Sequence, residues 1–293
     1  MAERSNSQSV IASAIAVAIG AAVAFAGSVG GDQWNGWPVF AICGALAFAV
    51  NWLVFVPSSL GKTEHYYDLT GGLTYITVTV VAVLLAASLD LRATLAAGMV
   101  LIWALRLSTF LFIRISGDGS DSRFDGVRDR PMRFFMAWTL QGLWVLLTAA
   151  TALAIITGGQ REPLGPIGYV GLAIWAIGML IEIVSDQQKS TFKKDPANKG
   201  RFINVGLWAW SRHPNYFGEI VLWIGMAVLA LPVLQGWQFV TLISPVFVTL
   251  LLTKVSGVPL LEDKADKRWG GQEDYEAYKK NTPVLMLRPP RSA

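Results

Sequence analysis

The sequence predicts an all-α membrane protein, a polytopic bundle of transmembrane helices. Hydrophobic residues make up 53% of its 293 positions, charged residues make up 15%, and the mean hydropathy is +0.46. Soluble domains carry about 25% charged residues, so this balance argues against a soluble enzyme. The apolar residues also gather in long runs, which is typical of helices that cross a bilayer.

Eight runs are long enough to span the hydrocarbon core, which takes about 20 apolar residues in a helix. The last two are divided only by Pro232 and the turn at 235–237. Seven spans are therefore the alternative, with the last two runs forming one re-entrant unit. The runs occupy residues 9–29, 38–57, 70–90, 93–113, 134–157, 167–185, 216–233 and 237–256.

The distribution of positive charge predicts the orientation, because Lys and Arg collect in cytoplasmic loops. With eight spans and a cytoplasmic N-terminus, all 24 Lys and Arg except Arg92, Arg106 and Arg161 fall on the cytoplasmic side. We therefore expect both termini in the cytoplasm. Three polar connections, at 61–70, 114–133 and 186–214, then face the same side and can converge on one site.

The chain divides into two parts by the placement of its ionisable residues. Residues 1–60 form an Ala-rich pair of transmembrane helices suited to close packing by small side chains. Residues 61–293 hold most of the ionisable groups and are expected to form a membrane domain with a cytosol-facing site and a polar C-terminal tail. The pattern points to the lipid bilayer as partner, predicts no nucleic-acid partner, and leaves the oligomeric state open.

Metal and disulfide chemistry are not expected. The chain has one cysteine, Cys43, and two histidines, His65 and His213. These are too few for an intramolecular disulfide or a zinc cluster, so no metal site is predicted.

Acidic and basic residues recur along the end of the sixth run. Glu182, Asp186, Lys189 or Ser190, and Lys193 are spaced three to four residues apart, which places them on one face of a helix. An acid within an apolar span normally faces the bundle or a water-filled cavity. Carboxylates followed by basic groups on one face can hold a ribose hydroxyl and then a phosphate. A solvated helix end with ion pairs is the alternative for single lysines.

The segment SRHPNYFGEI, which begins at Ser211, places polar groups at the start of the next apolar helix. Pro214 fits the first helical turn, and the free N–H groups there favour an anionic ligand. Asn215 can both donate to and accept from a carboxamide. Arg201 and Arg212 offer planar guanidinium groups suited to phosphate.

These motifs resemble the steroid 5α-reductase superfamily, and more closely its bacterial branch of uncharacterised membrane proteins with a 5α-reductase-like C-terminal domain. The family's S-x-x-x-N-[YF]-[FL]-G-E-I segment, followed by W-I-G, is matched from Ser211 to Gly225. Its Ser-Asp at a helix end is matched by Ser185 and Asp186, and its basic residue five positions before Gly-Leu-aromatic by Arg201. The resemblance covers about residues 60–285.

The resemblance implies an integral membrane reductase, in the inner membrane for a bacterium, that passes a hydride from NADPH to the C=C bond of a lipophilic enone such as a steroid or isoprenoid. Its cofactor-binding residues would be Asp186, Lys193, Arg201, Asn215, Glu219 and Tyr275. Arg212, His213 and Tyr216, which stand in the same segment as Asn215, are further candidates for cofactor binding. Lys193 stands where relatives usually carry Arg, which keeps the charge and loses the bidentate fork.

Conjugate hydride transfer also needs a hydrogen-bond donor at the enone oxygen. Steroid reductases use a glutamine-glutamate pair and a tyrosine, and this sequence lacks a matching pair. The segment GKTEHYYDLT offers Glu64, Tyr67 and Asp68 as catalytic candidates instead. Anchoring at the membrane interface is the alternative for the tyrosines.

The sequence is also compatible with two other functions. Membrane methyltransferases of the isoprenylcysteine and phospholipid type, which use S-adenosylmethionine, share an R-H-P-x-Y-x-G motif that Arg212 to Gly218 also satisfies. Those enzymes pair it with two glutamates near the tail, where this chain has Glu262 and Asp263. A non-catalytic lipid-binding protein is the third possibility, because the glutamine-glutamate pair is missing.

Overall fold

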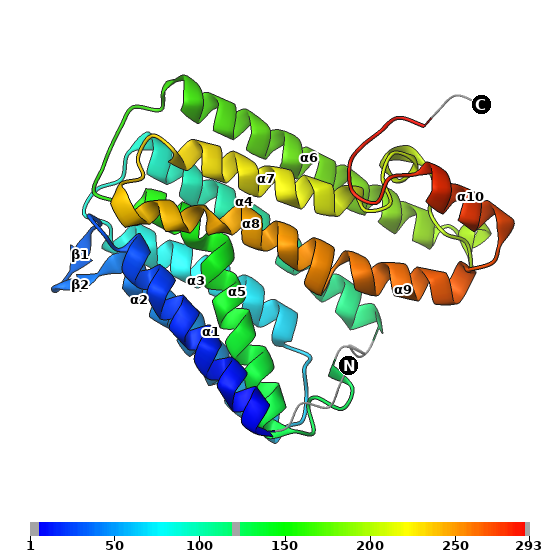
Figure 1. Cartoon of the computed structure of the whole chain (residues 1–293), viewed down its shortest axis with the longest axis horizontal. Helices are drawn as coiled ribbons and strands as arrows, with labels where there is room; N and C mark the ends of the chain where they lie inside the picture. The colour runs from blue at the N-terminus through cyan, green and yellow to red at the C-terminus, as the bar shows by residue number, and fades with distance from the viewer. Residues whose placement is uncertain (1–5, 119–123, 291–293) are drawn as a thin grey trace. The chain divides into compact units, whose positions relative to one another are not determined.

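A computed structural model describes residues 6–118 and 124–290, with the side chains of residues 110–118 left undescribed. The polar connection predicted at 114–133 therefore lies partly outside the described residues. The chain separates into two compact units, one of residues 1–168 and 230–244, the other of residues 169–229 and 245–293. The fold is mainly helical, as predicted (Figure 1).

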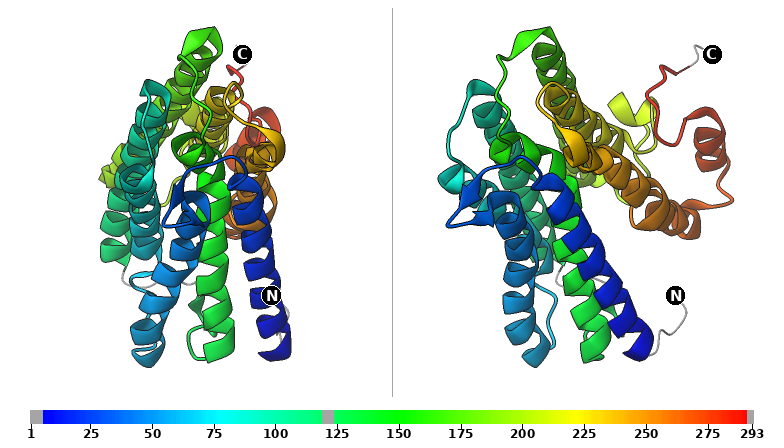
Figure 2. Two further views of the ribbon diagram at one scale, coloured as in Figure 1. Left: turned by 90° about the vertical axis from the view of Figure 1, so that its left-hand side faces the viewer. Right: turned by 60° about the vertical axis from the view of Figure 1, so that its left-hand side comes forward.

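The first unit is a helical bundle around one deeply buried helix. It contains α1 (Asn6–Gly27), α2 (Val39–Leu60), α3 (Tyr67–Leu85), α4 (Leu91–Asp118) and α5 (Pro131–Thr157). Helix α5 packs against all four of the others, and α1 runs beside it in both views of Figure 2. Its residues from Val145 to Thr157 are all buried, which explains why that stretch is apolar on every side.

Small residues allow the close packing expected of the first two helices. Gly20 of α1 faces the ring of Phe48, and Gly27 faces the ring of Phe40. A Cβ at either glycine would overlap the ring, so the small residues let α1 and α2 approach closely.

A short hairpin not anticipated from the sequence joins α1 to α2. Strands β1 (Gln33–Trp34) and β2 (Trp37–Pro38) pair antiparallel across Asn35 and Gly36, both of which have positive φ. Asn-Gly is the preferred dipeptide of such a two-residue turn. The first unit also includes η4 (Gly236–Leu242), which packs on α1 and α5.

The second unit contains most of α6 (Gly165–Lys194), the short helices η2 (Pro196–Asn198) and η3 (Gly206–Ala209), and α7 (Pro214–Ala230). It continues through α8 (Ile243–Leu250), a π-helical turn η5 (Leu251–Val255), α9 (Val258–Trp269) and α10 (Glu273–Asn281). Helices α6 and α7 lie side by side in Figures 1 and 2.

All eight predicted spans are helical, but they are not equal in length. Seven described helical segments are long and apolar enough to cross a membrane, whereas α7 has 17 residues and is shorter. The seventh long segment runs from Gly236 to Trp269 and includes α8 and α9. Arg92, which is not among the residues predicted on the cytoplasmic side, is buried at the start of α4 and donates to the carbonyl oxygens of Pro163 and Leu164.

Candidate active site

The site in the second unit is built on a glycine seam between α6 and α7. Gly171 and Gly178 of α6 are seven residues apart, as are Gly218 and Gly225 of α7, so each pair lies on one helix face. A Cβ on Gly178 would lie 2.4 Å from the backbone nitrogen of Leu222. The two backbones are therefore in contact, and polar side chains near the ends of both helices are brought together.

Asp186 and Asn215 meet at the end of this seam. The Asn215 Nδ2 donates to Asp186 Oδ1 at 3.2 Å, and only 6% of Asp186 is exposed. Glu182, one turn earlier on α6, is 3% exposed, which confirms that this acid faces the interior. The Asn215 Oδ1 is buried and has no hydrogen-bond partner among the described residues. A buried acceptor left unpaired costs about 1–3 kcal/mol, so this oxygen is suited to receive an N–H from a ligand.

Arg212 and His213, directly before α7, share one carboxylate of α9. His213 Nε2 lies 2.7 Å from Glu262 Oε1, and Arg212 Nη1 lies 2.9 Å from Glu262 Oε2. The His213 ring also lies nearly parallel to the ring of Tyr216, with centroids 5.7 Å apart. Burial lowers the pKa of His213 below its ordinary value, although Glu262 opposes this shift.

The loop that presents these groups is anchored from two directions. Trp208 Nε1 donates to the carbonyl oxygen of Ser185 on α6, at 2.9 Å, and the Tyr278 hydroxyl of α10 donates to the Trp208 carbonyl oxygen, at 2.7 Å. The C-terminal segment then crosses the loop, where the Arg212 N–H donates to the Pro283 carbonyl oxygen at 2.9 Å. These bonds fix the chain that leads into α7.

Tyr275 is buried in the tail, where its hydroxyl contacts Asp266. Its hydroxyl donates to Asp266 Oδ1 at 2.9 Å, and Lys279 Nζ reaches the same oxygen at 2.6 Å. Burial and the Asp266 carboxylate both raise the pKa of Tyr275. The hydroxyl is thus neutral and committed to Asp266 in this structure.

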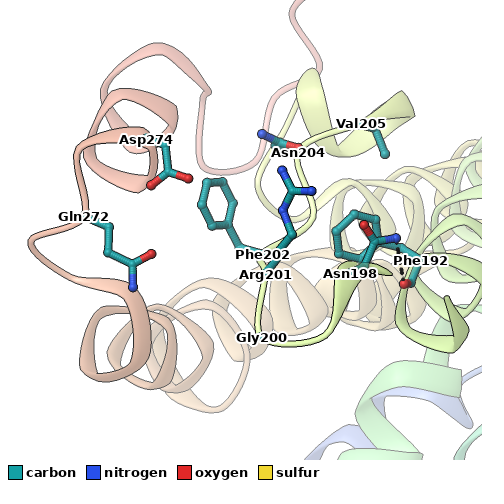
Figure 3. A pocket seen from close by; sticks show the side chains of 9 residues that line it. All are labelled: Phe192, Asn198, Gly200, Arg201, Phe202, Asn204, Val205, Gln272 and Asp274. Carbon is teal, nitrogen blue, oxygen red and sulfur yellow. Dashed lines mark hydrogen bonds between the residues drawn. The ribbon is translucent and has the colours of Figure 1, made fainter. Parts of the chain in front are cut away.

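Arg201 lines a separate polar hollow of about 180 Å³ (Figure 3). Its lining includes neither Asp186 nor Asn215. Lys193 is exposed near the end of α6, and Glu219 is half-buried on α7. Of the predicted cofactor residues, Arg201 is the one that lines this hollow. The hollow is lined by Phe192, Asn198, Gly200, Arg201, Phe202, Asn204, Val205, Gln272 and Asp274.

Glu64, Tyr67 and Asp68 belong to the first unit. Glu64 is 7% exposed and forms an ion pair of 2.9 Å with Arg128. The Tyr67 hydroxyl donates to the Ala137 carbonyl oxygen at 2.9 Å, and its ring packs on Trp138. Asp68 is half-buried in the first turn of α3. In this structure Glu64 is thus an ionised carboxylate that accepts hydrogen bonds and carries no proton to donate.

Sequence reasoning missed two features of this arrangement. The matched glycine spacing on α6 and α7 was readable from the sequence as small residues seven positions apart. The pairing of Arg128 with Glu64 carried no local signal. Among the described side chains, no three His, Cys, Asp or Glu residues gather in a way that could hold a metal ion.

Comparisons with known proteins give one family and several partial relatives. The family described as "Protein of unknown function (DUF1295)" matches residues 54–282. A probable O-methyltransferase, ustE of Ustilaginoidea virens, is 28% identical over 156 residues, which cover 45% of this chain and 54% of that protein. No solved structure gives a significant match.

Two mammalian relatives are similar over shorter stretches. The 3-oxo-5-alpha-steroid 4-dehydrogenase 1 of Bos taurus is 39% identical over 74 residues, 25% of this chain and 28% of that protein. The protein of the same name from Rattus norvegicus is 29% identical over 122 residues, 41% of each chain. The chain thus spans about half or less of the length of these relatives.

Proposed function

Because this chain belongs to the DUF1295 family, a member of the steroid 5α-reductase-like group, we propose that it is a membrane reductase that transfers a hydride from NADPH to the C=C bond of an enone lipid. The similarity to two 3-oxo-5-alpha-steroid 4-dehydrogenases supports this reaction class. The seven long apolar helices support an integral membrane protein. We extend the proposal to a bacterial inner membrane, with both termini in the cytoplasm.

The observation that carries the proposal is the hydrogen-bonded pair of buried Asp186 and half-buried Asn215. Asp186 holds the Asn215 Nδ2, which leaves Oδ1 as a buried acceptor at the first turn of α7. A carboxamide N–H satisfies such an acceptor, and the N-terminus of α7 favours a nearby phosphate. These features fit an adenine dinucleotide better than they fit an uncharged lipid.

The remaining cofactor residues have different proposed tasks. Arg212, His213, Tyr216 and Glu219 would line the dinucleotide near α7, while Arg201 or Lys193 would reach its phosphates. NADPH, when bound, supplies the hydride. Tyr275 would contribute after its hydroxyl exchanges Asp266 for the ligand.

The proposed catalytic residues are Glu64, Tyr67 and Asp68. Reduction of an enone builds negative charge on its oxygen, and a hydrogen-bond donor there stabilises that charge. The Tyr67 hydroxyl is a suitable donor once it leaves the Ala137 carbonyl oxygen. The Arg128 guanidinium keeps Glu64 ionised and orients it, so Glu64 would serve as a positioning group or would take up a solvent proton before passing it to the reduced substrate.

Ligand binding and turnover test the proposal directly. Purified protein should gain thermal stability with NADPH, and bound NADPH should be oxidised when an enone lipid is added. A saturated ketone of the same skeleton is the matched control and should cause no oxidation. Binding of NADPH without turnover across a broad enone panel would instead favour a non-catalytic lipid-binding protein.

A methyltransferase is the second candidate, and one geometric observation favours it. Glu262 forms an ion pair with Arg212 and a hydrogen bond with His213, which unites the R-H-P motif with a glutamate near the tail. The similarity to the probable O-methyltransferase supports the same reading. Stabilisation by S-adenosylmethionine and not by NADPH would select this function over the reductase.

A further inference from the structure

Glu262 contacts both ionisable residues that directly precede α7, Arg212 and His213. It reaches them from α9, 49 residues along the chain from His213. The positively charged Arg212 forms an ion pair with Oε2 at 2.9 Å, so the carboxylate is ionised and can only accept hydrogen bonds. The His213 nitrogen 2.7 Å from Oε1 must therefore carry a proton.

The charge state of His213 follows from its surroundings. Its side chain is 6% exposed, and it stands at the N-terminus of α7, where the helix dipole disfavours a cation. Arg212 beside it and Lys189 on α6 disfavour a cation further, whereas Glu262 on α9 favours one, and Tyr216 on α7 stacks on the ring. Burial is the largest of these effects, so the imidazole is neutral.

A neutral imidazole carries a proton on only one of its two ring nitrogens, and the hydrogen bond to Glu262 keeps that proton on Nε2. The other nitrogen, Nδ1, is then a bare acceptor. It is buried and has no hydrogen-bond partner among the described residues. A second buried acceptor, Asn215 Oδ1, lies two residues further on.

We infer that Glu262 is a positioning residue that fixes the Nε2–H tautomer of His213, so that Nδ1 accepts an N–H or O–H from the ligand bound before α7. The tautomer is a property of the free protein. The ligand contact rests on the proposed function, with the carboxamide or ribose hydroxyl of NADPH as the donor class.

Glu262→Gln provides a selective test. Because Arg212 only donates, the introduced amide must turn its oxygen toward Arg212 and its NH₂ toward His213. His213 Nε2 then has to accept, and the ring proton moves to Nδ1. The change keeps the size of the side chain and converts the ligand-facing acceptor into a donor. Asp263→Asn is the matched control, because Asp263 is exposed on α9 and pairs with Lys267.

The measurement is the ¹⁵N spectrum of imidazole-labelled full-length protein at mildly alkaline pH. The chain has only two histidines, so a His65→Gln background leaves His213 alone. We expect the Nε2–H tautomer in this background and with Asp263→Asn, and the Nδ1–H tautomer with Glu262→Gln. NADPH affinity should fall about tenfold or more with Glu262→Gln and stay unchanged with Asp263→Asn.

Several outcomes would overturn the inference. An imidazolium or an Nδ1–H tautomer in the parent protein would refute the role of Glu262, even if Glu262→Gln did not fold. An altered tautomer with unchanged NADPH affinity would refute the ligand contact. Failure of the parent protein to bind NADPH while showing the Nε2–H tautomer would count against the proposed function and leave the tautomer assignment standing.

Discussion

Gly218 of α7 faces the backbone of Glu182 on α6 so closely that a Cβ on Gly218 would lie 2.7 Å from the Glu182 nitrogen. Real Cβ atoms do not approach backbone this closely, so the contact requires glycine. It also explains how a short helix brings Asn215 to Asp186, because the seam sets the distance between the two helix axes.

Gly218→Ala should therefore destabilise the second unit. Forcing a methyl group against the backbone of α6 costs about 1–3 kcal/mol, and the helices must separate to relieve it. We expect a lower thermal midpoint and weaker NADPH binding. Gly98→Ala in α4 is the control, because nothing lies within 4 Å of its added Cβ and alanine favours a helix. Equal thermal midpoints for the two variants would contradict the close contact between α6 and α7 at Gly218.

Asn215→Ala tests the acceptor at the first turn of α7. The variant keeps Asp186 and removes the buried Oδ1, so NADPH affinity should fall about tenfold while the helical content is unchanged. Isothermal titration or fluorescence of the bound cofactor would measure the change. Gln187→Ala removes an exposed amide next to Asp186 and should have no effect. Unchanged affinity of Asn215→Ala would remove this residue from the site.

Arg201 and Lys193 are the two candidates for binding the 2′-phosphate of NADPH. Arg201 lines the polar hollow with Asn204 and Asp274, whereas Lys193 is exposed near the end of α6. A guanidinium holds a phosphate through two parallel hydrogen bonds, and only NADPH carries a 2′-phosphate. We therefore expect Arg201→Ala to weaken NADPH binding and to leave NADH binding unchanged. Lys193→Ala should weaken NADPH binding less. Equal losses of both cofactors with Arg201→Ala would assign Arg201 to another part of the ligand or to folding.

Much of the fold followed from the sequence, because a helix that crosses a membrane needs a long apolar run. All eight predicted runs are helical, and the buried acid Glu182 and the helix start at Pro214 were predicted from local pattern. The β1–β2 hairpin was overlooked, although Asn35-Gly36 signals such a turn.

Pairings between distant residues were beyond sequence reasoning. Arg128 joins Glu64 across 64 residues, and Glu262 joins His213 across 49. Helical periodicity determines which face a side chain occupies, and only tertiary packing determines which partner it meets. The cofactor residues were therefore predicted by type and motif, while the contacts that Asn215 makes with Asp186 and His213 makes with Glu262 were found only in the structure.

Glu64→Gln and Arg128→Gln separate an ion-pair role from a catalytic one. Each change breaks the 2.9 Å pair, so both should lower the thermal midpoint. Only Glu64→Gln should lower enone turnover in the folded protein, by about 100-fold if the carboxylate takes part in proton transfer. Stopped-flow oxidation of NADPH would measure the difference. Equal turnover in the two variants would make Glu64 a structural residue.

The pKa of His213 predicts how stability depends on pH. Burial lowers this pKa in the folded protein, while the unfolded chain keeps a value of about 6.5. Between these two values the unfolded state binds more protons, so stability rises with pH. The contribution is fully present above about pH 6.5 and is lost as the pH falls toward the folded pKa, by at most about 1.4 kcal/mol per pH unit.

Thermal midpoints measured from mildly alkaline to mildly acidic pH should therefore fall on the acidic side. His213→Gln should flatten this part of the curve, because the titrating group is gone. His65→Gln should keep it, because His65 is exposed. A midpoint that rose on acidification in the parent protein and not in His213→Gln would mean that Glu262 outweighs burial and that His213 is cationic before α7.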